Sequence, residues 1–275
     1  MIMKNQKLKR GMQGFIIVLI IIWIIWGNVT VDITNVVVRH EKIPETFSGY
    51  KIVQLSDLHN AEFGKENETL IKHIEKTKPD MIVITGDLVD SSRTNVDIAL
   101  KLIGKIVDIA PCYYVTGNHE SLIGSEYNRL ENGLNELGVV VLHDESVILE
   151  KDGEQIQVIG LDDSCFSGNI LPFKMKNVER TNNYTIMLSH RPELFEKYVE
   201  ENVDLVFTGH AHGGQFRIPF IGGVIAPDQG LLPKYDAGVY QEKNTTMIVS
   251  RGIGNSIVPI RINNRPEIVV VELQR

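Results

Sequence analysis

A pattern that recurs five times constrains the fold of this chain more than any other feature: a short apolar run is followed at once by small and polar residues. The five runs occupy residues 52–55, 81–84, 113–115, 185–188 and 205–207. Apolar runs of this length, bounded by turn-forming residues, are typical of buried β-strands. Helix-like stretches follow the first three runs, at residues 66–77, 96–106 and 126–137. This alternation of strands and helices predicts an α/β fold.

The second half of the chain is richer in strand patterns. Residues 147–150 and 155–159 flank an Asp-Gly pair, which is a signal for a β-hairpin, and residues 267–273 predict a last strand. The glycine- and proline-rich region 209–238 suits a long loop system at an active site. There is no internal repeat and no linker to a second domain, and 275 residues with 43% hydrophobic content can bury one large core. We therefore expect one domain over residues 32–275.

The first 31 residues differ from the rest of the chain. Residues 11–31 contain only three strongly polar side chains, and about 20 apolar residues suffice to span a bilayer. The apolar run is preceded by four basic residues: Lys4, Lys7, Lys9 and Arg10. We predict a transmembrane signal-anchor over residues 1–31. Two alternatives stay open: a cleaved signal peptide, although residues 27–30 lack an Ala-x-Ala-like site, and a buried core helix.

The distribution of basic residues predicts the orientation of this anchor. All four leading positive charges precede the apolar run, and the roughly 15 residues after it contain Arg39 as their only arginine or lysine. By the positive-inside rule, the amino end stays in the cytoplasm. We expect a single-pass protein of the cell membrane whose catalytic domain is extracytoplasmic.

Charge and cysteine content exclude two classes of protein. A net charge of −7 and a pI near 5.7 argue against a protein whose main work is binding phosphate backbones, so nucleic acid is not an expected partner. Cys112 and Cys165 are too few and too far apart for a disulfide framework or a cysteine-rich zinc site. Whether they are free or bonded to each other stays open.

The polar blocks after the five runs carry most of the chain's potential metal ligands. They read SDLH (56–59), TGDLVD (85–90), TGNHE (116–120), SHRPE (189–193) and TGHAHGG (208–214). Ligands bind at the carboxyl ends of strands in open α/β sheets, so we expect these blocks to converge. Two aspartates, one asparagine and five histidines would then meet. This set is too large for one ion and suits two, and imidazole and carboxylate without thiolate favour Mn, Fe(II) or Zn.

Spacing within one block has its own explanation. Residues two apart on an extended strand point to the same side. This spacing allows Asp57 and His59 to chelate one ion from a strand end, although the pair alone would be more simply explained as an incidental one.

The order of these blocks resembles that of the calcineurin-like metallophosphoesterases. The matching motifs are Asp57-x-His59, Gly86-Asp87, Gly117-Asn118-His119-Glu120, His190 and Gly209-His210-Ala211-His212. The segments SRGIGNS and PIRINNRPEI, between residues 250 and 268, are similar to a membrane-linked bacterial branch of that superfamily. The resemblance implies a four-layer fold, a β-sandwich of two mixed sheets flanked by helices, with a dinuclear metal site at one sheet edge.

The same resemblance implies roles for individual residues. Asp57, His59 and His212 would bind the first metal, and Asp87 would bridge both. The second metal would be bound by Asn118, His190 and His210. His119 resembles the family histidine that stabilises the transition state or protonates the leaving group, with a supporting hydrogen-bond role as its alternative.

These assignments predict a phosphoesterase. Two divalent metal ions would activate a hydroxide to attack a phosphodiester or pyrophosphate, and an envelope phosphoester, which could be lipid-linked, is the expected substrate. Two alternatives are a non-catalytic metal-binding scaffold on the same fold and an intracellular nucleotide phosphatase or phosphodiesterase. The sequence leaves the natural substrate, the metal identity and the export route open.

Some neighbouring residues support weaker expectations. Glu120, Asp90 and Glu193 are candidates for orienting ligand imidazoles, as carboxylates around metal sites do. Arg251 is a candidate contact for substrate phosphate, with an ordinary loop arginine as its alternative. Met175 and Phe173 could line a lipid-accepting face, although isolated apolar residues normally pack.

Overall fold

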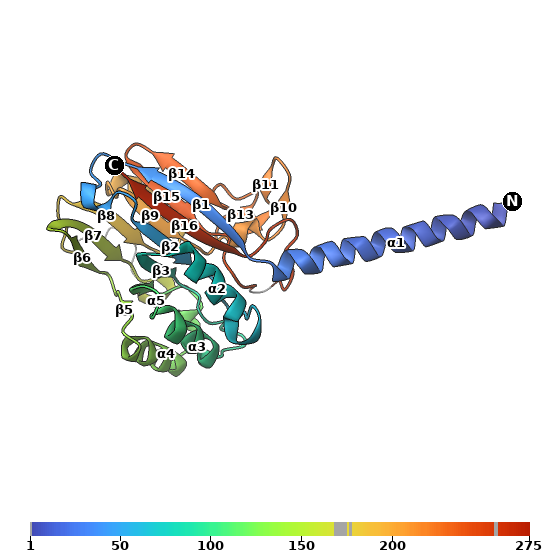
Figure 1. Cartoon of the computed structure of the whole chain (residues 1–275), viewed down its shortest axis with the longest axis horizontal. Coiled ribbons are helices and arrows are strands. Elements are labelled where there is room, and N and C mark those ends of the chain that lie inside the picture. The colour runs from blue at the N-terminus through green and yellow to red at the C-terminus, as the bar shows by residue number, and fades with distance from the viewer. Residues whose placement is uncertain (1, 168–174, 176–177, 256–257) are drawn as a thin grey trace.

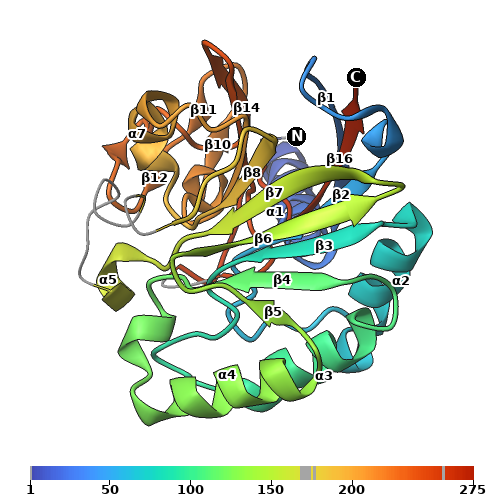
Figure 2. The ribbon, with the colours of Figure 1, turned by 90° about the vertical axis from the view of Figure 1, so that its left-hand side faces the viewer.

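The computed structural model describes residues 2–167, 175, 178–255 and 258–275, and its central feature is a pair of six-stranded sheets packed face to face (Figures 1 and 2). The first sheet has the order β1-β16-β2-β3-β4-β5. Its strands are β1 (Asp32–Arg39), β16 (Glu267–Gln274), β2 (Lys51–Leu55), β3 (Met81–Thr85), β4 (Cys112–Val115) and β5 (Val140–Val141). All neighbours are parallel except β16 and β2, so the sheet is mixed.

The second sheet has the order β14-β15-β9-β8-β7-β6. Its strands are β14 (Gly238–Glu242), β15 (Thr245–Val249), β9 (Leu205–Thr208), β8 (Tyr184–Leu188), β7 (Glu154–Gly160) and β6 (Glu145–Lys151). The central strands are parallel, and each edge strand joins its neighbour in an antiparallel hairpin. The apolar runs predicted as strands all lie in one of these two sheets.

Helices complete the four layers. On the outer face of the first sheet lie α2 (Glu68–Thr77), α3 (Val96–Ile106) and α4 (Ser125–Glu136), and α7 (Phe195–Glu200) packs on the second. In α3 the apolar residues recur every three or four positions, so one stripe faces the sheet and is buried. A separate apolar core fills the space between the two sheets. The predicted α/β fold of two mixed sheets flanked by helices is confirmed.

Short elements connect these layers. The single-turn helices are η1 (Glu45–Phe47), η2 (Lys65–Asn67), η3 (Glu120–Leu122), α5 (Ser164–Ser167), η4 (Pro192–Leu194) and η5 (His212–Gly214). Two small hairpins follow η5, formed by β10 (Arg217–Ile218) with β11 (Gly222–Gly223) and by β12 (Ile225–Ala226) with β13 (Gly230–Leu231). The region predicted as a long loop system therefore consists largely of these hairpins.

The amino-terminal helix α1 (Ile2–Val29) projects away from the domain (Figure 1). Its segment Arg10–Val29 is long and apolar enough to cross a membrane, with a mean hydropathy of 2.2 and no buried residue. β1 begins three residues after this helix ends. The absence of buried residues in this apolar segment argues against the alternative of a buried core helix.

The structure also bears on Met175 and on the two cysteines. Met175 is buried in the core beneath α7, so it does not line an exposed lipid-accepting face, and Phe173 lies outside the described residues. Cys112 is buried, Cys165 is exposed, and both are free thiols.

Candidate metal centre

The five polar blocks meet at one edge of the two sheets. Their side chains form several groups of potential ligands, and in two of them every member is buried: one of Asp57, His59 and His212 and one of Asp87, His190 and His210. In each of these two groups the ligand atoms lie within 4.8 Å of one another. The residues come from segments more than 150 positions apart in the chain. The expected convergence is present.

The distances in the first group fit a shared metal ion. Nε2 of His59 lies 3.2 Å from Nε2 of His212, and the latter lies 3.5 Å from Oδ1 of Asp57. Ligand atoms that sit about 2.0–2.2 Å from one ion are separated from each other by roughly 3.0–3.5 Å. The third pair, Nε2 of His59 and Oδ1 of Asp57, is 4.0 Å apart. These three side chains therefore fit a divalent cation in donor type and in two of their three distances.

The second group has the same spacing. Nε2 of His190 lies 3.2 Å from Oδ2 of Asp87, 3.2 Å from Nδ1 of His210 and 3.2 Å from Oδ1 of Asn118. The same Oδ2 of Asp87 lies 3.5 Å from Nε2 of His59 in the first group. Asp87 is thus positioned between the two groups.

Most of the candidate ligands have an unusual backbone conformation. Asp57, His59, Asp87, His210 and His212 all have positive φ, between 46° and 64°. This left-handed region is costly for residues other than glycine, and such residues concentrate at functional sites. Asp57 and His59 consequently do not alternate along an extended strand. The predicted explanation for their shared direction was wrong, because β2 ends at Leu55 and a tight turn aims both side chains.

Two glycines permit the close approach of neighbouring loops. A Cβ atom on Gly117 would lie 2.2 Å from Oδ1 of Asp87, and one on Gly209 would lie 1.9 Å from Oγ of Ser56. Neither contact is possible without displacing a candidate ligand loop.

The environment sets different protonation states in the two groups. Burial lowers the pKa of His59 to about 4 and that of His212 to about 3, so both imidazoles are neutral at neutral pH. Burial acts in the same direction on His190, but the adjacent Asp87 carboxylate outweighs it and raises the pKa of His190 to about 10. The His190 and Asp87 side chains therefore form a charged pair.

Hydrogen bonds orient the imidazoles of the second group. Nδ1 of His190 donates to the carbonyl oxygen of Thr85 at 2.7 Å, which leaves Nε2 directed at Asp87. Nε2 of His210 lies 2.9 Å from Oδ2 of Asp228, which leaves Nδ1 directed at His190. Partners of this kind select the tautomer that binds a metal.

Asp228 belongs to a network that sequence reasoning missed. Arg191 is buried, makes a bidentate contact with Asp163 and also bonds Asp228, so it connects that carboxylate to the sheet edge. Asp162 and Asp163 follow β7 after one intervening residue, Leu161. They repeat the pattern of a strand followed by a polar block, which is the signal that could have identified this segment.

Of the three carboxylates expected to orient imidazoles, Glu193 lies close to His210, whereas Glu120 and Asp90 have other partners. Glu120 is buried and accepts hydrogen bonds from the backbone N–H groups of Asp87, Leu88 and Gly117, so it joins two ligand loops. Asp90 bonds Ser92 and Arg93. Burial and the charge of Asp87 raise the pKa of Glu120 to about 8. For Glu120 the expected role was wrong, because its oxygens are committed to backbone amides.

His119 lies beside the two groups. Its backbone N–H donates to Oδ1 of Asp87 at 2.9 Å, and its ring meets the His59 ring edge-on at 4.5 Å between centroids. Nδ1 of His119 accepts from the backbone N–H of Ser91 at 3.0 Å. In the neutral imidazole the proton is then on Nε2.

Two arginines near the first group are committed to structural contacts. Arg251 pairs with Asp32 and Glu267, so the structure favours a structural role over the expected contact with phosphate. Arg261 is fully buried and was missed from the sequence. Its guanidinium donates to the carbonyl oxygens of Arg251 and Gly254 and lies 3.5 Å from Nδ1 of His212.

A groove of about 390 Å³ opens beside the candidate metal centre. It is lined by His59, Asn60, Ala61, Arg93, Asn95, Ile98, Asn255 and Pro259. A substrate could reach the first ligand group through this groove.

Comparison with known proteins identifies the family. The calcineurin-like phosphoesterase family matches residues 50–214. The chain is 31% identical over 252 residues to YkuE of Bacillus subtilis, named as an uncharacterized metallophosphoesterase, covering 89% of this chain and 86% of that protein. It is 30% identical over 230 residues to the phosphodiesterase YaeI of Escherichia coli, covering 82% of each.

A longer animal protein is also similar. The transmembrane protein with metallophosphoesterase domain of Bos taurus is 30% identical over 261 residues, which cover 88% of this chain and 57% of that protein. Members of the matched family normally bind two divalent metals, in agreement with the two ligand groups. The chain therefore belongs to the calcineurin-like phosphoesterase family and is a metal-dependent phosphoester hydrolase.

Proposed function

We propose that this protein is a membrane-anchored phosphodiesterase that uses two divalent metal ions. Asp57, His59 and His212 would bind one ion, and Asp87 would bridge to the other. The second ion would be bound by Asn118, His190 and His210. The observation that carries this proposal is the position of Asp87, whose Oδ2 lies within 3.5 Å of an imidazole nitrogen from each group.

The chemistry follows from this arrangement. Two divalent cations, when bound, neutralise phosphate charge and lower the pKa of water. His119 would donate a hydrogen bond from Nε2 to a phosphate or leaving-group oxygen. The Ser91 N–H bond to its Nδ1 supports this role, because it favours the neutral tautomer that donates from Nε2. Glu120 would hold the loops of Asp87 and Asn118 in register through their backbone amides.

A diester is the preferred substrate class because the nearby arginines are already engaged. Arg191 is bound by Asp163 and Asp228, Arg261 by carbonyl oxygens, and Arg93 by Asp90. A phosphomonoester carries a second negative charge that would need a further cation. A phosphodiester does not, and the similarity to a protein named phosphodiesterase supports this choice.

The membrane location rests on residues 1–31, proposed as a signal-anchor before a catalytic domain at 32–275. The apolar segment Arg10–Val29 is preceded by Lys4, Lys7 and Lys9. This asymmetry favours a cytoplasmic amino end and an extracytoplasmic domain. The substrate would then be an envelope phosphoester.

Metal analysis and kinetics of the purified full chain test the catalytic proposal. We expect two metal ions per chain, chosen among Mn, Zn and Fe, and hydrolysis of an aryl phosphodiester at least as fast as that of the corresponding monoester. Activity confined to the monoester would contradict the choice of substrate class and leave the family assignment unaffected.

Protease accessibility tests the location. In intact spheroplasts, an added protease should digest the catalytic domain. Complete protection until lysis would reverse the orientation and favour intracellular nucleotides as substrates.

A further inference from the structure

Exposed apolar side chains gather on the two hairpins after η5 and on the loop at 258–262. Of the thirteen exposed large apolar residues after α1 in the described part of the chain, nine lie between Ile218 and Ile262 on these segments. We define the apolar rim as six of them, namely Phe220, Ile221, Leu231, Leu232, Val258 and Ile260. Phe220 is fully exposed and Leu231 is 75% exposed. Patches of this kind mark interaction sites.

Hydrogen bonds join the segments of the rim into one surface. The backbone N–H of Arg217 donates to the carbonyl oxygen of Ile262, and Gln215 donates to the carbonyl oxygens of Val258 and Ile260. The N–H of Leu232 donates to the carbonyl oxygen of Val224. These hydrogen bonds hold the segments that carry the rim residues in fixed positions relative to one another.

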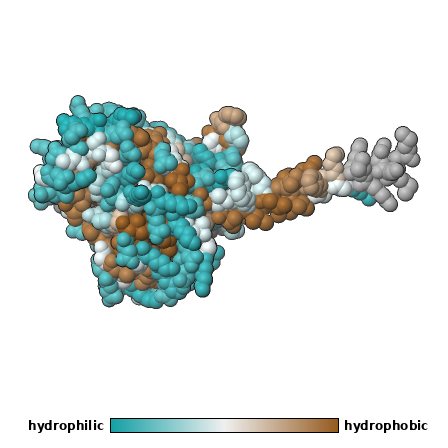
Figure 3. Space-filling view, in the orientation of Figure 1, coloured by the Kyte–Doolittle hydropathy of each residue, from teal (hydrophilic) through white to brown (hydrophobic). Residues whose placement is uncertain are grey.

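The rim lies next to the end of α1. The backbone N–H of Arg261 donates to Oδ1 of Asn28 at 2.8 Å, and Nδ2 of Asn28 donates to the carbonyl oxygen of Arg261 at 2.9 Å. The guanidinium of Arg265 stacks over the ring of Trp26 at 3.7 Å. Figure 3 shows hydrophobic residues on a projection beside the base of the helix, where Figure 1 places β10 and β11.

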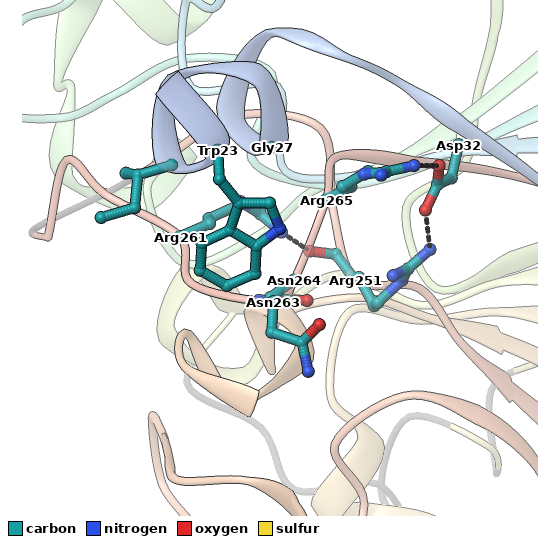
Figure 4. Close-up of a pocket in the computed structure, with 9 residues that line it drawn as sticks. Trp23, Gly27, Asp32, Arg251, Arg261, Asn263, Asn264 and Arg265 are labelled. Atoms are coloured by element: carbon teal, nitrogen blue, oxygen red, sulfur yellow. Dashed lines mark hydrogen bonds and ion pairs between the residues drawn. The ribbon is translucent and has the colours of Figure 1, made fainter. Parts of the chain in front are cut away.

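The junction of α1 and the domain has the composition of a membrane interface. A pocket of about 180 Å³ lies there, with Trp23 and Gly27 of α1 on one side and three arginines on the other: Arg251, Arg261 and Arg265 (Figure 4). Tryptophan is favoured at the headgroup level of a bilayer, and Arg265, which lies over the Trp26 ring, adds a polar contact there. The last turn of α1 therefore suits the membrane surface.

The backbone also directs the rim outward. Phe220 and Leu232 have φ values of 69° and 54°. Bulky residues rarely adopt this left-handed conformation, and its cost persists where the surrounding structure requires it. Both side chains project into solvent, which points to a partner that receives them.

We propose that the apolar rim inserts into the headgroup region of the bilayer that α1 crosses. The occupant is a bilayer and not another protein because α1 leads into β1 through only Thr30 and Val31, and this short connection keeps the rim beside the membrane. Separate hairpin tips with apolar ends suit a lipid surface, into which each can insert independently.

This inference deepens the proposed function, and it rests on the membrane anchor proposed there. Asn255 and Pro259 line the groove beside His59, and Val258 and Ile260 of the same loop belong to the rim. The groove thus opens at the lipid surface. The substrate class that fits is a phosphodiester carried by a membrane lipid, with its acyl chains remaining in the bilayer.

Depth-dependent quenching in phosphatidylcholine vesicles tests the insertion. The full chain carries Cys165→Ser and a single new labelling site, either Leu231→Cys on the rim or Asp152→Cys as the control, and Cys112 stays buried. Asp152 is exposed in the turn between β6 and β7. Figure 1 draws these two strands at the end of the domain opposite α1. Each variant is labelled with a fluorophore, and the vesicles contain phosphatidylcholine with a nitroxide near the headgroup.

We expect quenching of the label at position 231 and none at position 152. The chain's two tryptophans, Trp23 and Trp26, both lie in α1 and report separately on the anchor. Quenched tryptophans with an unquenched label at 231 would overturn the rim proposal and leave the anchor intact. Unquenched tryptophans would show that α1 does not insert into the bilayer, which would overturn both the anchor and the rim proposal. If the fluorescence of the label at position 231 changes only with the protein-to-lipid ratio and not with the nitroxide, the rim contacts a second copy of the chain. That result would also overturn the proposal.

A pair of substrate probes tests the substrate class. The double variant Phe220→Ser with Leu231→Ser should hydrolyse a soluble aryl phosphodiester normally. It should hydrolyse an alkyl-chained aryl phosphodiester in phosphatidylcholine vesicles about tenfold more slowly, because two apolar anchors are lost. The control Val37→Ser with Ile148→Ser removes exposed apolar residues elsewhere and should change neither rate. Equal effects on both probes would overturn the assignment to lipid substrates, and a wild type inactive on both would instead refute the proposed diesterase.

Discussion

The two halves of the candidate metal centre contain the same kinds of side chain in different electrostatic states. In the half formed by Asp57, His59 and His212, burial keeps both imidazoles neutral. In the half around His190 and His210, the Asp87 carboxylate holds His190 in its charged form. The difference teaches that desolvation dominates where the nearest carboxylate oxygen lies 3.5 Å from the imidazole nitrogen, and that a carboxylate dominates where it is also hydrogen-bonded, as Asp87 is to His190 at 3.2 Å.

The halves also differ in their support. His190 and His210 bond a backbone carbonyl and Asp228, respectively. In the other half, among the described residues, Nδ1 of His59 is buried without a hydrogen-bond partner, and His212 lies beside the Arg261 guanidinium. We therefore expect the two halves to respond differently to substitution and to pH.

Removing the residue shared by both halves should have the largest effect. Asp87→Asn should abolish turnover and lower the occupancy of both metals, because a bridging carboxylate cannot be replaced from one side. Metal analysis of the purified variant, with circular dichroism to confirm folding, measures this. Loss of only one metal would show that Asp87 belongs to a single half.

His119 tests whether the centre extends beyond the two halves. His119→Ala should keep both metals and lower the rate by roughly 10²- to 10⁴-fold, the effect of one positioned acid, base or donor. Steady-state kinetics and metal content on the same sample provide the comparison. A missing metal would make His119 a ligand, which its position beside His59 and Asp87 would permit.

Asp228 tests the importance of the outer support. Asp228→Asn should weaken metal binding at the His210 half by about 10- to 100-fold, the usual effect of losing a partner that orients a ligand imidazole. Glu201→Gln is the control, since it removes a carboxylate that pairs with an arginine, Arg180, outside the ligand groups. Chelator titration measures the metal affinity of both variants. An equal loss of affinity in the control would show that removing a negative charge, and not losing the partner of His210, weakens metal binding.

The pH dependence of metal binding should also separate the halves, by about tenfold for each pH unit. His190 is protonated below its raised pKa of about 10, so a metal must displace that proton, and affinity should fall about tenfold for each pH unit below that value. The pKa values of His59 and His212 are low, so their half should show no such slope near neutrality.

Calorimetry in buffers of different ionisation enthalpy can count the released protons. The variant His212→Ala leaves the His190 half, and the variant His210→Ala weakens it. We expect one proton released on filling the His190 half and none on filling the other. Equal proton release in both variants would contradict the difference in protonation.

Local patterns were sufficient to predict the strands and the candidate ligands. An apolar run followed by turn residues can be read within about ten positions, and so β2, β3, β4, β8 and β9 were predicted close to their observed bounds. The ligand candidates follow directly from the same runs, because the carboxyl ends of strands in such sheets are brought together. From that rule we predicted that one edge of the sheets would hold the candidate ligands Asp57, Asp87, Asn118, His190 and His210.

Tertiary structure alone decided what surrounds those ligands. Arg261 reaches His212 across 49 positions, and Asp163 reaches Arg191 across 28. No local period relates such pairs, since the packing of the layers sets their distance. The left-handed turns at Asp57 and His59 and the position of the apolar rim beside α1 have the same origin. The sequence alone determined which chemical groups are available, and long-range packing determined their protonation, their orientation and the surface on which their groove opens.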